Sequence, residues 1–412
     1  MTTGSSTTPS RWAELDGLRA LAVLAVFLFH DVHTGLARGY LGVDVFFVLS
    51  GFLITSLLRS ELGRSQHIDL RAFWVRRAAR LLPAAYLVVA ITVLVVISRH
   101  ANPGGTRAPT VRAALPTLLY YVNWVQLHRS TGLFSHMWSL ALEQQFYVVW
   151  PPVLAVAGLV AVRRRGTRPA GVLGVVGLLL VATQLWRHLY WTRASYGARP
   201  PSWWDPPFAR MLVADRADML LWGCLLALIV AVRPRPGRAM SLVVGIVGSA
   251  ALVGLGAFVA GSGMKGHDGW SSGAFRWLSP QWQPLYVGAS AALAIAALVL
   301  VRPWPLRWLA WGPARWIGEV SYGVYVWQFV VLLLVPWTWL QGRWLLVPVQ
   351  GALLVAVAAS SYYVVERPIR RWAGSRFGTP RTTRTGLHRA PVAAESSATS
   401  GTPRPELVGA DP

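Results

Sequence analysis

The chain alternates between long apolar stretches and short polar connections. A membrane-spanning helix needs about 20 mainly apolar residues, with a range of roughly 17–25. Ten stretches of this kind occur, and each predicts a spanning helix. They lie near residues 18–34, 40–58, 81–98, 136–160, 170–188, 209–231, 240–260, 282–301, 316–336 and 344–365. The pattern therefore predicts an all-α, polytopic membrane protein with about ten transmembrane helices.

One further stretch, near residues 111–128, is too polar and too short to cross a bilayer. Its aromatic residues Tyr120, Tyr121 and Trp124 suit the headgroup layer, where such side chains are enriched. We expect an interfacial or re-entrant helix there.

The apolar pattern stops near the C-terminus. Glu366 to Pro368 is expected to close the last helix, and after Trp372 the chain becomes rich in Arg, Thr, Ser, Pro and Ala. Such a segment cannot bury a core and favours disorder. We therefore expect three parts, which are a disordered N-terminus (1–10), a transmembrane domain (11–372) and a disordered cytoplasmic tail (373–412).

Composition and charge support a membrane protein. Of 412 residues, 54% are hydrophobic and only 13% are charged, whereas soluble proteins carry about a quarter charged residues. The net charge of +23 would suggest a nucleic-acid partner, but Lys265 is the only lysine and apolar runs dominate. The nucleic-acid class is therefore excluded. The one cysteine, Cys224, rules out a disulfide framework and a zinc site built from cysteines.

The arginines also predict an orientation. If the N-terminus is cytoplasmic, most basic residues fall in loops on the cytoplasmic side, as the positive-inside rule requires. We expect a multi-pass protein of the inner (plasma) membrane with both termini in the cytoplasm.

The first span carries polar residues on one side. At 100° per residue, Arg19 and His30 lie within about 20° of each other around the helix and about 16 Å apart along it. Asp16 lies within about 40° of the same face, and Asp31 follows His30 directly. A histidine with this setting is a candidate general base or acid. The alternatives are that Arg19 reaches lipid phosphates and that His30 is a buried polar residue bonded to a neighbouring helix.

The second span combines a carboxylate, two aromatic rings and a hydroxyl. Asp44 could orient a histidine, as carboxylates do in catalytic triads, or it could cap the helix. Phe46 and Phe47 precede Ser50 by four and three residues, so these side chains share one side of a helix. Without a second signal, this span is equally compatible with a small-residue helix interface.

Taken together, the two spans resemble the acyltransferase 3 family of integral membrane O-acyltransferases. The family pattern of an arginine, ten residues and a histidine is present as Arg19 to His30, beginning with DGLRA, and GVDVFFVLSGFLIT follows at 42–55. Further similar segments are FWVRRAARLLPAAY (73–86), MWSLALEQQFYVVWP (137–151), DRADMLLWGCLLA (215–227), IGEVSYGVYVWQFVV (317–331) and YYVVERPIRR (362–371). The resemblance covers the chain up to about residue 372, in the form that has no C-terminal hydrolase-like domain.

The resemblance implies an acyl-CoA donor, with acetyl-CoA as the first choice and no metal. In the family, arginines at the start of the third span are implicated in handling the donor, and this carries over to Arg76, Arg77 and Arg80. Guanidinium groups suit phosphate oxygens, although positive-inside charge is an alternative explanation for these residues. The donor site is expected to include Arg19, Phe46, Phe47 and Ser50 as well.

A polar face also runs along the fourth predicted span. Ser139, Glu143 and Tyr147 follow one another at intervals of four residues, so they share a side of the helix. A buried glutamate is costly without a partner, and an interhelical ion pair is as good an explanation as a catalytic role.

Two further groups are expected to support the substrate or the structure. Asp215 and Asp218 flank Arg216, but no histidine or third carboxylate accompanies them, so a metal site is rejected. In the ninth span, Tyr325 precedes Gln328, which stands where many relatives have a histidine. This departure places more of the chemistry on His30.

These features lead to one functional hypothesis and two alternatives. The hypothesis is an O-acyltransferase that moves a short acyl group from acyl-CoA to a hydroxyl of a carbohydrate, a glycolipid or a natural product such as a macrolide. His30 would activate the hydroxyl or briefly carry the acyl group, so direct transfer and an acyl-enzyme route are both open. The alternatives are a transporter or flippase for a glycoconjugate, although the chain shows no repeated halves, and a non-catalytic membrane scaffold.

Overall fold

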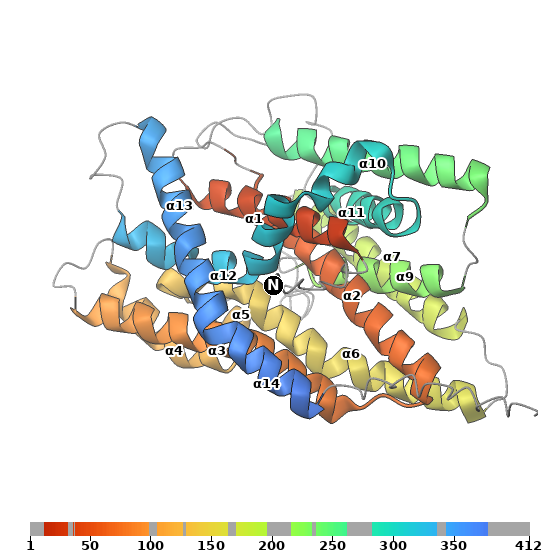
Figure 1. Ribbon diagram of the computed structural model, residues 1–412, viewed down its shortest axis with the longest axis horizontal. Helices are drawn as coiled ribbons and strands as arrows, with labels where there is room; N and C mark the ends of the chain where they lie inside the picture. Colours follow the sequence, from red (N-terminus) through yellow and green to blue (C-terminus); the bar gives the residue numbers. More distant parts are fainter. Residues whose placement is uncertain are drawn as a thin grey trace, which may run out of the picture. The chain divides into compact units, whose positions relative to one another are not determined.

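The computed structural model describes residues 12–31, 36, 38–98, 105–126, 129–163, 170–195, 216–232, 236–261, 282–335 and 343–377. Within these ranges all regular secondary structure is helical (Figure 1). Seven of the described helices are long and apolar enough to cross a membrane. The prediction of an all-α, multi-pass membrane protein is therefore confirmed. The predicted tail segments 1–10 and 378–412 lie outside the described residues, as does Asp215.

The helices follow one another with short connections. In the first part of the chain they are α1 (Ala13–His30), α2 (Leu41–Ser65), α3 (Leu70–Ser98), α4 (Arg107–Leu118), α5 (Val122–Gln126), η2 (Gly132–Met137) and α6 (Trp138–Arg163). In the second part they are α7 (Ala170–Ser195), α9 (Asp218–Val232), α10 (Arg238–Ala260), α11 (Gln283–Leu300), η3 (Trp304–Ala310), α12 (Gly312–Leu334), α13 (Arg343–Ser361), η5 (Tyr362–Glu366) and α14 (Arg367–Phe377).

A helix occupies each of the ten predicted windows, but the number of spans stays a prediction. Seven helices reach the apolar character of a span, and α1, α6 and α9 are not among them. In α1 the charged residues Glu14, Asp16 and Arg19 fill the first turns, and α9 has only 15 residues. Helices α2 and α3 extend beyond their windows, because hydropathy marks only the apolar part of a helix. The stretch 111–128 is divided between α4 and α5, with 12 and 5 residues.

The end of the last long helix differs from the expectation. Glu366 to Pro368 does not close it, because the chain continues as helix α14 to Phe377 (Figure 1). The turn η5 before the proline is π-helical, and the N–H of Arg367 bonds to the carbonyl of Tyr362, five residues back. Proline lacks an N–H and its ring crowds the preceding turn. The wider π turn accommodates this defect, so the helix passes through the proline without ending.

The helices that carry the polar residues approach one another closely. Helix α1 packs against α12 and α2, and α2 packs against α9. At Gly318 of α12, a Cβ atom would overlap the backbone carbonyl of Asp16 in α1. At Gly51 of α2, it would overlap the carbonyl of Leu220 in α9. Since lipid tails are as apolar as side chains, close backbone packing at small residues is a principal force between such helices. These contacts position α1, α2 and α12 around the site described next.

Candidate active site

Two adjoining cavities lie among α1, α2, α3, α6 and α12. We call the first the arginine cavity; it has a volume of about 90 Å³ and is walled by three guanidinium-bearing residues, Arg19, Arg77 and Arg80. It brings together most of the residues that the sequence proposed. Its walls include Phe46, Phe47, Ser50, Ser139, Glu143, Tyr147 and Tyr325.

The three arginines come from two helices. Arg77 and Arg80 are three residues apart on α3 and therefore share a face, whereas Arg76 is turned by about 100° from Arg77. Arg76 does not line the cavity. It lies 3.9 Å (Nη2 to Oε2) from Glu61 and donates to the backbone carbonyl of Phe377 at the end of α14. The structure thus separates Arg76 from the other two arginines of the predicted group.

A hydroxyl–carboxylate cluster faces the arginines. The Ser50 hydroxyl donates to Oε1 of Glu143 at 2.5 Å, and the Tyr147 hydroxyl donates to the same oxygen. The Ser50 and Tyr147 oxygens are 2.6 Å apart. The Arg77 guanidinium lies 5.5 Å from the centre of the Tyr147 ring. The predicted polar face of α6 therefore meets α2, and the Glu143 carboxylate is held by two hydroxyl groups.

The second cavity, which we call the histidine cavity, has a volume of about 180 Å³. It is lined by Phe29, His30, Tyr40, Val43, Asp44, His136, Trp138, Arg216 and Tyr325. Val43 and Tyr325 also line the arginine cavity. These two side chains therefore form a wall that both cavities share.

His30 has one nitrogen engaged within its own helix. Its Nδ1 lies 2.9 Å from the backbone carbonyl oxygen of Val26. A carbonyl can only accept, so this contact assigns the proton to Nδ1 and makes Nε2 the hydrogen-bond acceptor. The rings of Phe29 and Phe329 meet the imidazole edge-on, at 5.0 and 4.8 Å between centroids. This arrangement holds the ring in an orientation suited to a base.

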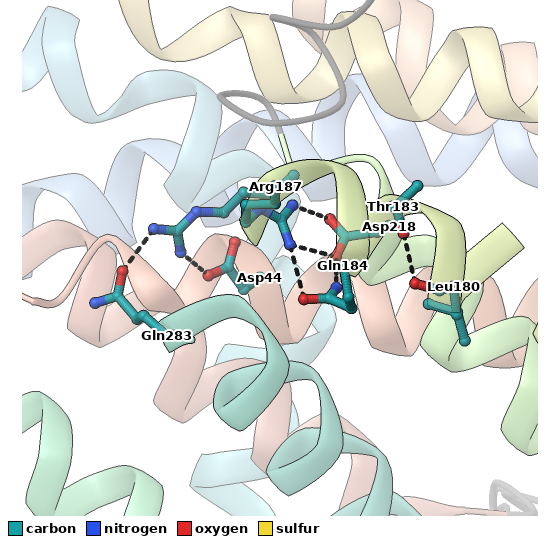
Figure 2. A network of polar contacts seen from close by, with 8 residues as sticks. Asp44, Leu180, Thr183, Gln184, Arg187, Asp218 and Gln283 are labelled. Atoms are coloured by element: carbon teal, nitrogen blue, oxygen red, sulfur yellow. Dashed lines mark hydrogen bonds and ion pairs between the residues drawn. The ribbon is translucent and has the colours of Figure 1, made fainter. Parts of the chain in front are cut away.

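Asp44 is paired with an arginine in the structure. Its carboxylate accepts a hydrogen bond from Arg216, whose other terminal nitrogen donates to Oε1 of Gln283 at 2.9 Å (Figure 2). Asp44 is 2% exposed. The structure therefore gives the carboxylate that we expected beside His30 an arginine partner, contributed by the segment before α9.

Asp218 belongs to a neighbouring buried pair. Its two oxygens accept from the two terminal nitrogens of Arg187 at 2.7 and 2.9 Å, and Gln184 donates to it at 2.6 Å (Figure 2). This bidentate pair joins α7 to α9 and lines neither cavity. The buried residues Asp31 and Gln328 also line neither cavity. Across the described ranges, no group of three or more histidine, cysteine, aspartate or glutamate residues could hold a metal ion.

Two residues of the histidine cavity were missed by the sequence analysis. His136 lies in the short helix η2, one turn before the regular spacing of α6 begins, so a search for helical faces passes over it. Arg216 was considered only as the residue between two acids. Its surroundings carried the signal, because a cation beside a long apolar run needs an anionic partner.

Comparisons with known proteins agree with the helical membrane architecture. The family described as "Acyltransferase domain" matches residues 12–366. The peptidoglycan O-acetyltransferase OatA of Listeria monocytogenes is 30% identical over 388 residues, which cover 87% of this chain and 55% of the relative. The O-acetyltransferase OatA of Staphylococcus aureus is 31% identical over 382 residues, which cover 87% of this chain and 57% of the relative. The chain thus spans about half the length of these curated relatives. No solved structure matches it.

Proposed function

The chain belongs to the acyltransferase domain family, and from that premise we propose that it is a membrane O-acyltransferase that moves an acetyl or other short acyl group from acyl-CoA to a hydroxyl group. The acceptor is a carbohydrate, either free or as part of a glycolipid. The names of the relatives from Listeria and Staphylococcus support an acetyl group, and the Listeria name supports a carbohydrate acceptor.

The observation that carries this proposal is the pair of adjoining cavities with different chemistry. Arg19, Arg77 and Arg80 give one cavity a strongly cationic wall, which suits the phosphates of an acyl-CoA. His30 gives the other cavity a base. Donor and acceptor would meet where Val43 and Tyr325 separate the two.

The orientation supports the same assignment of the cavities. The connection between α2 and α3 is rich in arginine, which favours a cytoplasmic position under the positive-inside rule. Arg77 and Arg80 lie near that end of α3. The arginine cavity would therefore open toward the cytoplasm, where acyl-CoA is found, with both chain termini on the same side of the plasma membrane.

The proposed reaction uses His30 as the general base. Nε2 removes the proton of the acceptor hydroxyl, whose oxygen attacks the thioester carbonyl carbon. The new C–O bond forms, the C–S bond breaks, and the thiolate of coenzyme A leaves with the proton that His30 removed. Positioned proton transfer of this kind contributes roughly 10²–10⁴-fold to the rate.

Acyl transfer can be measured with the purified chain in lipid nanodiscs. The donor is radiolabelled acetyl-CoA, and the acceptor source is the envelope fraction with culture extract from cells that lack the gene. We expect base-labile label to appear in a carbohydrate with the wild type. His30→Ala should lose roughly 10²-fold or more of this rate.

The matched control is His188→Ala, because His188 contacts the ring of Trp282 and lines neither cavity. It should transfer acetyl at the wild-type rate. A wild-type protein that consumes no acetyl-CoA would contradict the proposal, as would a fully active His30→Ala variant.

A further inference from the structure

His136 is the second imidazole of the histidine cavity. It is 4% exposed, and within the part of the chain that the structure describes neither ring nitrogen has a hydrogen-bond partner. Its ring stacks flat on Phe329, with 4.5 Å between centroids and 13° between planes. His30 meets the same phenylalanine ring edge-on at 4.8 Å. Two histidines from distant segments therefore share one aromatic support and one cavity.

The backbone at His136 is fixed from α12. The hydroxyl of Tyr325 donates to the His136 carbonyl oxygen at 2.7 Å, and the Tyr325 oxygen lies 2.7 Å from Oγ of Ser139. A buried polar group without a partner costs about 1–3 kcal/mol. An imidazole that is held rigidly, buried and left without a partner on a cavity wall is suited to a ligand that enters the cavity.

Other donors on the cavity wall are directed at protein atoms. Arg216 donates to Asp44 and Gln283, and the Tyr40 hydroxyl donates to Gln283 at 3.2 Å. His30 donates through Nδ1 to Val26, so its Nε2 is an acceptor. His136 makes no ion pair among the described residues, and burial favours its uncharged form. A neutral imidazole always carries one N–H, and at His136 this group is available to the cavity.

We propose that His136 is a further catalytic residue, which donates its ring N–H to the acyl carbonyl oxygen as that oxygen becomes negatively charged. This inference rests on the proposed acyltransferase function. When the acceptor oxygen attacks, the carbonyl electron pair moves onto the oxygen and is held by His136. When the C–S bond breaks, the pair returns to re-form the C=O bond. The proton follows the path through His30 described above, so His136 starts and ends the reaction neutral.

The proposal also explains why Gln328 is tolerated. Gln328 is buried and lines neither cavity. The chain therefore supplies a second imidazole to the site from η2, at a position unrelated to residue 328.

Two substitutions separate hydrogen bonding from packing. His136→Phe keeps an aromatic ring against Phe329 but removes the N–H, and His136→Gln keeps an N–H donor. In the nanodisc assay, His136→Phe should lower kcat by roughly 10²–10³-fold, the usual cost of losing one oxyanion donor. The KM for acetyl-CoA should change little. His136→Gln should recover most of the loss, and its kcat should keep the wild-type pH profile, because the proposed residue does not titrate. His188→Phe is the control and should behave as the wild type.

The outcomes distinguish this inference from the proposed function. An active wild type and an inactive His30→Ala variant, together with a fully active His136→Phe variant, would overturn the role of His136 alone. Equal losses in His136→Gln and His136→Phe, with lowered melting temperatures in both, would assign His136 to packing and also overturn it. Absence of acetyl transfer by the wild type would overturn both statements.

Discussion

Neighbouring arginines on one helix have different tasks in this structure. Arg77 and Arg80 line the arginine cavity, whereas Arg76 contacts Glu61 and the end of α14. We expect Arg77→Gln and Arg80→Gln each to raise the KM for acetyl-CoA by roughly tenfold or more, because a hydrogen bond to a charged group contributes about 1.5–3 kcal/mol. Steady-state kinetics with varied acetyl-CoA checks this.

Arg76→Gln is the matched control for those variants. It should leave the KM unchanged and lower the melting temperature, since it removes a contact between α3 and α14. A KM that rises equally in all three variants would indicate that the arginines act only through general surface charge.

The pair Arg187–Asp218 should behave as a buried ion pair. Both side chains are at most 1% exposed, so Asp218→Leu leaves an unpaired guanidinium and should lower the free energy of unfolding by about 3–5 kcal/mol. Arg187→Met combined with Asp218→Leu removes both charges and should be far less destabilising than the single change. Thermal unfolding in detergent measures both. A double variant that loses the sum of the two single losses would contradict this.

At this scale the sequence predicted positions better than partners. The 11-residue spacing of Arg19 and His30 follows from helix geometry alone, and these residues line two adjoining cavities. The partner of Asp44 could not be predicted in the same way. Arg216 is 172 residues away in sequence, and only the packing of α2 against α9 brings them together. His136 was missed because η2 does not follow the spacing of an α-helix.

Helix contacts through glycine can be tested with single methyl groups. A Cβ atom at Gly318 would overlap the backbone of Asp16, whereas at Gly63 of α2 no atom lies within 4 Å. Gly318→Ala should therefore separate α1 from α12, lower the melting temperature and reduce acetyl transfer, because Arg19 and His30 are carried by α1. Gly63→Ala should be neutral or stabilising by up to about 1 kcal/mol, as expected for alanine in a helix.

These helices were largely predictable, since each apolar window contains one. Their ends were not, because charged residues continue α2 and α3 past the apolar part. The π turn η5 shows a second limit. Whether a proline ends a helix depends on whether the preceding turn can widen, and the proline motif alone does not show this.

The orientation of the whole protein can be tested with single cysteines. Cys224 is fully buried and should give little background. His67 lies between α2 and α3, and Ser130 lies between α5 and η2, with α3 crossing the membrane between them. An impermeant maleimide should label Ser130→Cys in intact cells and His67→Cys only after permeabilisation. The reverse pattern would place the arginine cavity on the side away from acyl-CoA.

The wall formed by Val43 and Tyr325 has a consequence for the cell that houses this protein. With a donor on one side of this partition and an acceptor on the other, only the acyl unit needs to pass between compartments. Neither coenzyme A nor the sugar has to permeate, and no continuous aqueous path is required. The electrochemical gradient can then be preserved while an activated group made inside the cell modifies a molecule outside it.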